Sequence, residues 1–140
     1  MNNLFSSLAR YAERQDENYL TESLVFVLRL LLERAEQPGL KLLANICGPE
    51  TLDWFHRAED VAISTQFTIE VGRPDIFIEI GKDTIIFIEV KHDSGLGCNQ
   101  LEGYFEYLER SPYPNKQLVF LTRSKHSIQE TTLDRVVFSM

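Results

Sequence analysis

Apolar residues near the N-terminus recur every three or four positions, which is the spacing of an amphipathic α-helix. A first helix is expected over residues 3–15, and a longer second helix follows it, capped by Asp16 or Asn18. Pro38-Gly39 is expected to stop the second helix, and another helical turn or two should precede Gly48-Pro49. The apolar faces of these two predicted helices are formed by Leu4, Leu8, Tyr11, Leu20, Leu24, Val27, Leu28, Leu31 and Leu32.

In the middle of the chain the apolar residues recur at every second position instead of every third or fourth. Apolar and polar residues alternate over residues 65–71, which predicts a half-buried strand. Two apolar runs, residues 76–80 and residues 84–88, are joined by a turn at residues 81–83 and predict a hairpin. Because the second run is apolar on both faces until Glu89, its strand should be central in the sheet.

A helix and more strands follow this hairpin. Residues 101–108 show helical spacing and end before Pro112, residues 117–122 predict a fourth strand, and residues 135–138 predict the start of a fifth. The order is therefore helix, three strands, helix, strand (αβββαβ). Hairpins followed by one helical crossover predict an α/β fold with a central mixed sheet of four or five strands flanked by helices.

Length and composition bound the possible functions. At 140 residues without repeats or an internal linker, residues 1–140 are expected to form one domain. Its apolar end at residues 136–138 predicts a short edge strand and a natural protein that continues beyond Met140, with an additional domain. No apolar run is long enough to span a membrane, no signal peptide is evident, and the two cysteines suggest neither disulfides nor zinc, so a cytoplasmic location is expected.

The net charge of −7 argues against a general nucleic-acid coat protein, which would be basic. It does not exclude a nuclease, because a metal site needs acids and the metal supplies positive charge locally. From Arg110 to Gln129 the chain carries basic residues and no acids. This stretch is either a solvated edge or a strip that contacts backbone phosphates.

The candidate chemistry lies on the predicted hairpin. Asp75 ends Gly72-Arg73-Pro74-Asp75 just before the first strand, and Glu89-Val90-Lys91 ends the second. Residues two apart in a strand share a face, so Glu89 and Lys91 project together, and the hairpin can bring Asp75 beside them. Such charges are costly to bury and add nothing to a core, but they suit a divalent metal and a phosphate.

This arrangement resembles the PD-(D/E)xK nuclease superfamily, whose members share the restriction-endonuclease-like fold. Pro74-Asp75 and Glu89-Val90-Lys91 match its motif, and Glu22 matches an acid on an upstream helix. Gln100, with Tyr104 one turn further on, fits a pattern seen in many members. The resemblance covers most of the chain, and the order of elements agrees with it.

The resemblance implies a Mg²⁺- or Mn²⁺-dependent nuclease that hydrolyses phosphodiester bonds, with DNA as the expected substrate. Asp75, Glu89, the Val90 carbonyl and Glu22 would supply the oxygen ligands of the metal site. Lys91, kept protonated by the neighbouring acids, would lie near the attacking water and a phosphate oxygen. A role in genome defence would fit the superfamily, as an association only.

Further residues complete the expected site. Gln100 would orient Lys91 or contact the scissile phosphate. Arg123, Lys125 and Tyr104 would contact the nucleic acid, and a homodimer would be compatible with the superfamily.

Each assignment has a structural alternative. Asp75 could be a turn residue, and Glu89 could be a solvated strand end or form a salt bridge with Lys91. Glu22 could be a first-turn acid that the dipole of its helix stabilises. Tyr104 could be a core residue. At the level of function, the alternatives are a non-catalytic nucleic-acid- or protein-binding module of the same fold and a regulatory domain whose acidity mimics nucleic acid.

Overall fold

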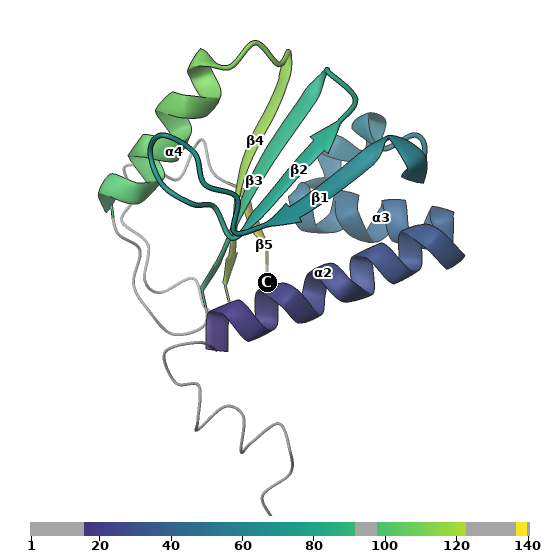
Figure 1. The fold of residues 1–140 in the computed structure, drawn as a ribbon. Helices are drawn as coiled ribbons and strands as arrows, with labels where there is room; N and C mark the ends of the chain where they lie inside the picture. Colours follow the sequence, from purple (N-terminus) through teal and green to yellow (C-terminus); the bar gives the residue numbers. More distant parts are fainter. Residues whose placement is uncertain (1–15, 92–97, 123–136, 140) are drawn as a thin grey trace, which may run out of the picture.

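A five-stranded mixed sheet lies between two helical layers in the computed structural model, which describes residues 16–91, 98–122 and 137–139 (Figure 1). Helices α2 and α3 cover one face of the sheet, and α4 covers the other (Figure 1). The elements are α2 (Asp16–Arg34), α3 (Glu36–Cys47), the 3-10 turns η1 (Pro49–Trp54) and η2 (Ala58–Asp60), β1 (Val61–Thr65), β2 (Ile76–Ile80), β3 (Thr84–Lys91), α4 (Cys98–Arg110), β4 (Asn115–Thr122) and β5 (Val137–Ser139).

The strands follow one another across the sheet in the order β1-β2-β3-β4-β5. The first three pair antiparallel, whereas β4 runs parallel to β3 and β5 runs parallel to β4. Helix α4 makes the crossover between β3 and β4, as parallel neighbours require. The predicted mixed α/β sheet, the central position of β3 and the short terminal edge strand are therefore confirmed.

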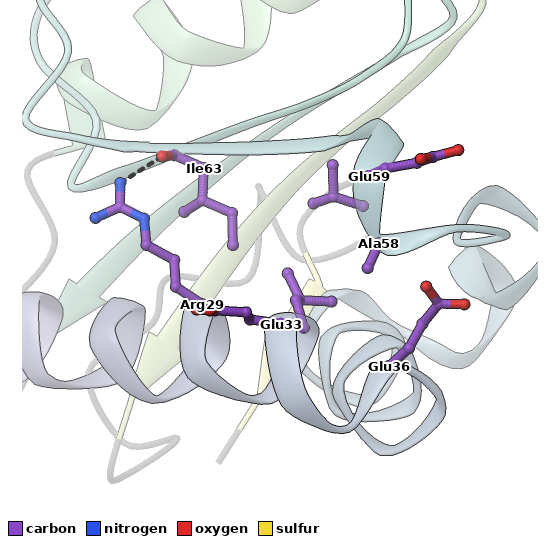
Figure 2. Close-up of a pocket in the computed structure, with 8 residues that line it drawn as sticks. Arg29, Glu33, Glu36, Ala58, Glu59 and Ile63 are labelled. Carbon is purple, nitrogen blue, oxygen red and sulfur yellow. Dashed lines mark hydrogen bonds between the residues drawn. The ribbon is translucent and has the colours of Figure 1, made fainter.

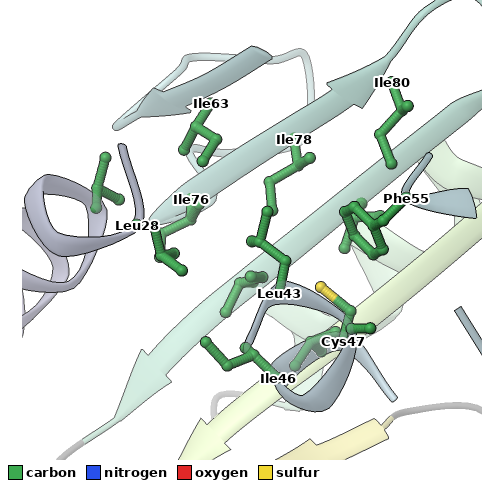
Figure 3. Close-up of a cluster of buried hydrophobic side chains, with 14 of the residues drawn as sticks. Leu28, Leu43, Ile46, Cys47, Phe55, Ile63, Ile76, Ile78 and Ile80 are labelled. Carbon is green, nitrogen blue, oxygen red and sulfur yellow. The ribbon is translucent and has the colours of Figure 1, made fainter. Parts of the chain in front are cut away.

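The two faces of β3 bury different side chains. Ile86, Ile88 and Val90 belong to the apolar core under α2 and α3, where Leu43 and Cys47 of α3 meet the sheet (Figure 3). The alternate residues of β3 belong to a second core, under α4. Because side chains alternate along a strand, the odd-numbered positions of β3, including position 89, face α4.

The boundary between α2 and α3 differs from the prediction. Helix α2 ends at Arg34, and Pro38-Gly39 lies in the first turn of α3 instead of stopping α2. Proline is tolerated there because the first N–H groups of a helix have no intrahelical partner. A Cβ on Gly39 would lie 3.0 Å from the backbone nitrogen of Leu32, so glycine lets α3 pack closely against the end of α2.

The first strand also differs from the prediction. It covers Val61–Thr65 and not residues 65–71, and it ends where Gln66 adopts a positive φ of 54°. Ile69 forms only an isolated bridge with Gly72, and its side chain is buried in the core under α4. The alternation over residues 65–71 therefore reflects contact with a helix, and not pairing within the sheet.

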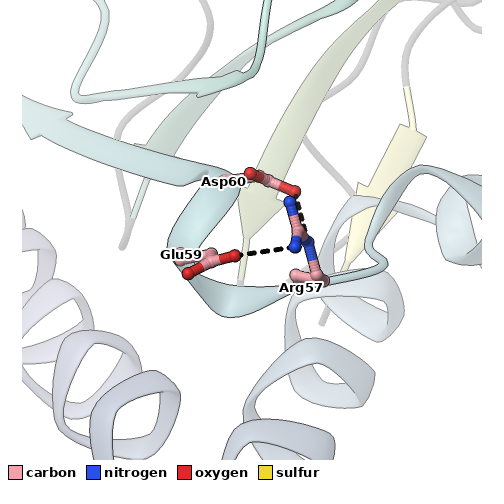
Figure 4. Close-up of polar contacts among 3 residues, drawn as sticks. All are labelled: Arg57, Glu59 and Asp60. Carbon is pink, nitrogen blue, oxygen red and sulfur yellow. Dashed lines mark hydrogen bonds and ion pairs between the residues drawn. The ribbon is translucent and has the colours of Figure 1, made fainter.

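Polar side chains at the surface make a contact between α2 and β1 and a small ion-pair cluster before β1. The Arg29 guanidinium of α2 donates a hydrogen bond of 2.6 Å to the Ile63 carbonyl of β1, beside a cavity with an acidic rim (Figure 2). Arg57 pairs with Glu59 and Asp60 at 2.9 and 3.2 Å before β1 begins (Figure 4). These charges are largely exposed, so the pairs contribute little to stability.

No helix within the described part of the chain is long and apolar enough to cross a membrane. The helix predicted over residues 3–15 lies outside the described residues.

Candidate active site

Two carboxylates meet where β2 begins and β3 ends. The β2–β3 register pairs Ile76 with Ile88, and one further step places Asp75 opposite Glu89. The Asp75 amide N–H donates to Oε1 of Glu89 at 3.3 Å, and the Val90 amide N–H donates to Oδ2 of Asp75 at 2.8 Å. Only 2% of Glu89 is exposed, whereas Asp75 is half-buried. The predicted convergence of the two acids is therefore present.

Pro74 leaves the Val90 carbonyl without a hydrogen bond that β2 would otherwise donate to it. In an antiparallel ladder the N–H and C=O of one residue point to the same neighbouring strand, and the Val90 N–H points toward Asp75. A second step of the register places Pro74 opposite Val90. Proline has no N–H, so it cannot donate the ladder hydrogen bond that the Val90 carbonyl would otherwise accept.

Gln66, which the sequence analysis did not select, holds Asp75 and links it to Asn18 of α2. The Gln66 side-chain amide donates to Oδ1 of Asp75 and to Oδ1 of Asn18, at 3.3 Å in each case. The first turn of α2 therefore borders the point where β2 begins (Figure 1). In the sequence, the only indication of this role is that Gln66 directly precedes the segment that leads to Asp75.

Tyr104 of α4 lies beneath the acid pair. Burial raises the pKa of its hydroxyl to about 12; the hydrogen bond from Gln100 opposes this rise, and the charge and hydrogen bond of Glu89 add to it. Gln100 donates to the hydroxyl at 3.0 Å, and the Arg73 backbone also contacts it. A Cβ on Gly72 would lie 3.1 Å from Cε1 of Tyr104, so glycine lets this backbone pass close over the ring.

The expectation that Tyr104 contacts nucleic acid is wrong in this structure. The side chain is 0% exposed and belongs to the core under α4, which was the alternative for this residue. Its hydroxyl instead positions Glu89. Gln100 contacts that hydroxyl, and its expected contact with Lys91 or with a phosphate stays a prediction.

The other candidates are less closely tied to the pair. Glu22 lies on α2 one turn after Asn18 and is exposed; among the described residues no three acidic, histidine or cysteine side chains form a metal-binding group, so its role as a ligand stays a prediction. Lys91 is the last residue of β3, opposite Thr122 in the register. The Lys91 side chain, Arg123 and Lys125 fall outside the described part.

Protein-family models, curated proteins and solved structures were all compared with this chain. None matches it. The geometry of the site is therefore the basis for inferring what the protein does.

The oxygen atoms of this site fit a hard divalent cation. Asp75 and Glu89 offer carboxylate oxygens on one face of the sheet, and the Val90 carbonyl points to the same pair of strands. Carboxylate and carbonyl oxygens are the preferred protein ligands of Mg²⁺, which also retains several waters. Two carboxylates at one buried strand end repel one another, and a cation would remove that repulsion.

Proposed function

We propose that this protein is a divalent-metal-dependent nuclease of the PD-(D/E)xK type, with a restriction-endonuclease-like fold, that hydrolyses phosphodiester bonds of DNA. The observation that carries the proposal is the pairing of Asp75 with Glu89 beside the Val90 carbonyl. A plain structural role would not require an acid as buried as Glu89 opposite a second acid. The helix–hairpin–helix–strand order around the pair supports the same proposal.

The residues have separate roles in this proposal. Asp75, Glu89 and the Val90 carbonyl would hold the metal, and Glu22 would add a carboxylate directly or through water. A bound Mg²⁺ lowers the pKa of its water and offsets the charge that develops on the phosphate. Lys91 orients the attacking water and donates to a non-bridging phosphate oxygen.

The surrounding side chains fix the geometry that the reaction needs. Gln66 holds one oxygen of Asp75 while the Val90 N–H holds the other, so the carboxylate cannot rotate freely. Tyr104 holds Glu89 from below through its hydroxyl, and because burial raises the pKa of that hydroxyl to about 12, it stays protonated far above neutral pH. Such fixed dipoles and ligands cost no reorganisation during the reaction.

The direct test is a cleavage assay with supercoiled plasmid, single-stranded DNA and RNA, in Mg²⁺, Mn²⁺ or EDTA. We expect DNA cleavage that requires the metal and is lost in Asp75→Asn, which keeps the shape of the side chain. Asp83→Asn is the matched control, because Asp83 is exposed in the turn at the opposite end of the same hairpin. Unchanged cleavage by a folded Asp75→Asn protein contradicts the proposal.

The same assay separates the nuclease from a non-catalytic binding module of this fold. A binding module retains nucleic acid or a protein partner but shows no Mg²⁺-stimulated cleavage. It also tolerates Lys91→Ala, because that lysine then has no reacting phosphate to contact. A nuclease loses cleavage in Lys91→Ala while its fold is unchanged.

A further inference from the structure

A pocket with aromatic walls lies on the α4 face of the sheet, the face on which Glu89 also lies. Its volume is about 410 Å³, within the range typical of small-molecule sites. We call it the aromatic pocket. Its walls come from the segment after β1, from β2 and β3, and from the end of α4, and include Phe67, Phe77, Ile85, Tyr107, Arg110 and Tyr113.

The aromatic rings form a continuous stack from the surface into the core. The ring centroids of Phe67 and Phe77 are 4.8 Å apart, and those of Phe77 and Phe87 are 5.4 Å apart. Phe87 in turn contacts Tyr107 at 5.8 Å. Phe67 is 48% exposed, so the stack ends on an open ring against which a planar group can lie.

Polar groups also line the pocket. Arg110 supplies a cation, with an exposed Glu106 at 3.3 Å as its partner. Ser111 also lines the pocket, although its hydroxyl oxygen is buried and forms no hydrogen bond within the described part of the chain. Glu70 supplies an acceptor for an amino group. Aromatic walls with a cation and an acceptor match a heterocyclic base that carries a phosphate.

The wall of the pocket that Phe67 and Phe77 form lies close to the acid pair. Phe77 follows Asp75 by two residues and faces the same side of the sheet, at a separation of roughly 7 Å along the strand. Gln66 donates to Asp75, and the next residue, Phe67, stacks on Phe77. One short segment therefore contributes to both sites.

We propose that the aromatic pocket binds an unpaired nucleotide, with its base against Phe67 and its phosphate near Arg110. A base inside a duplex is stacked on its neighbours and cannot lie against Phe67, so this site favours single-stranded or locally opened substrate. This inference rests on the proposed nuclease function for the source of the nucleotide. The same chemistry would also accept a free mononucleotide.

The test is fluorescence anisotropy with a labelled single-stranded oligonucleotide in EDTA, so that binding is measured without cleavage. Phe67→Ala is expected to weaken binding about tenfold, since one base–aromatic stack is worth about 1–3 kcal/mol. Phe26→Ala is the matched control, because Phe26 is 67% exposed on α2, away from the pocket. Arg110→Gln should flatten the salt dependence of binding, while Arg57→Gln should not.

Two further probes identify the ligand. A blunt duplex of the same sequence should bind equally well to wild type and Phe67→Ala; equal loss for duplex and single strand overturns the inference. Adenosine monophosphate is the second probe. If wild type binds it and Phe67→Ala does not, the pocket binds free nucleotides. If wild type binds the single strand but not adenosine monophosphate, the pocket binds the substrate strand. The inference is also overturned if wild type binds neither the single strand nor the mononucleotide. It is overturned as well if Phe67→Ala and Phe26→Ala change binding equally.

The two proposals fail separately. If wild type cleaves DNA and Phe67→Ala changes neither cleavage nor affinity for the single strand, the nucleotide site is overturned and the nuclease function stands. Strand binding that depends on Phe67, without cleavage in any metal, overturns the nuclease and keeps the pocket.

Discussion

The Val90 amide of β3 donates a hydrogen bond of 2.8 Å to Oδ2 of Asp75, which directly precedes β2. The sheet backbone thus fixes a carboxylate where the β2–β3 ladder ends. The Val90 N–H would otherwise donate to the Pro74 carbonyl in the ladder, and Pro74 has no N–H to donate to the Val90 carbonyl in return. The Pro-Asp pair therefore ends the strand pairing and presents oxygen ligands at the same point.

The first prediction concerns Glu89. In wild type, saturating Mn²⁺ should raise the melting temperature by roughly 5–10 °C, because a ligand that binds only the folded state stabilises it by mass action. Glu89→Gln should lose this increase, since an amide is a poor substitute for a carboxylate ligand. Differential scanning fluorimetry with and without Mn²⁺ measures the effect. Glu102→Gln, at an exposed site on α4, should keep the full increase.

The second prediction tests the role of Pro74. Pro74→Ala restores an N–H that can donate to the Val90 carbonyl and so compete with a metal for that oxygen. We expect Mn²⁺ affinity to fall roughly three- to tenfold, in line with the net value of one hydrogen bond. Isothermal titration calorimetry provides the measurement, and Pro114→Ala, at an exposed position before β4, is the control. Equal affinities in all three proteins would show that the carbonyl is not a ligand.

The third prediction concerns Tyr104 and pH. An unfolded tyrosine loses its proton near its ordinary pKa of 10, whereas folded Tyr104 keeps it until about 12. The resulting stability is fully present below pH 10 and is lost as the pH rises toward 12. Tyr104→Phe should therefore cost about 1 kcal/mol of unfolding free energy near neutral pH and reduce the alkaline decline. Urea unfolding at about pH 9 and about pH 11 measures this, with Tyr19→Phe as the exposed control.

The fourth prediction compares two glycines at the contact between α4 and the segment before Asp75. Gly72→Ala should destabilise the fold by about 1–3 kcal/mol, because φ is +152° and the new Cβ would lie 3.1 Å from the Tyr104 ring. Gly103→Ala should stabilise it by up to about 1 kcal/mol. Gly103 is inside α4, and its new Cβ would make an ordinary contact of 3.5 Å with Val71. Chemical unfolding of both variants gives the two opposite signs.

Sequence patterns predicted the hairpin and the acid pair because both depend on local signals. Strands β2 and β3 are apolar runs bounded by a turn, and Asp75 and Glu89 follow from their positions at the strand ends. The error at β1 arose because Ile69 is apolar for a different reason, namely contact with α4. Period alone does not distinguish these two causes.

The residues that support the site could not be predicted in the same way. Asn18 and Gln66 are far apart in the sequence, and Asn18 meets the Gln66 amide that holds Asp75 only after α2 has packed on the sheet. The contact of Tyr104 with Glu89 likewise depends on where α4 docks. Such contacts depend on tertiary packing, which leaves no periodic signal in the sequence.

The location of the acid pair within a single hairpin has a consequence for folding kinetics. Hairpins form within microseconds, whereas the parallel β3–β4 pairing must wait for the α4 crossover to close a longer loop. We therefore expect Asp75 and Glu89 to meet while both are still in water, before Tyr104 covers Glu89. Divalent cations that bind the nascent hairpin should then accelerate refolding as well as stabilise the finished protein.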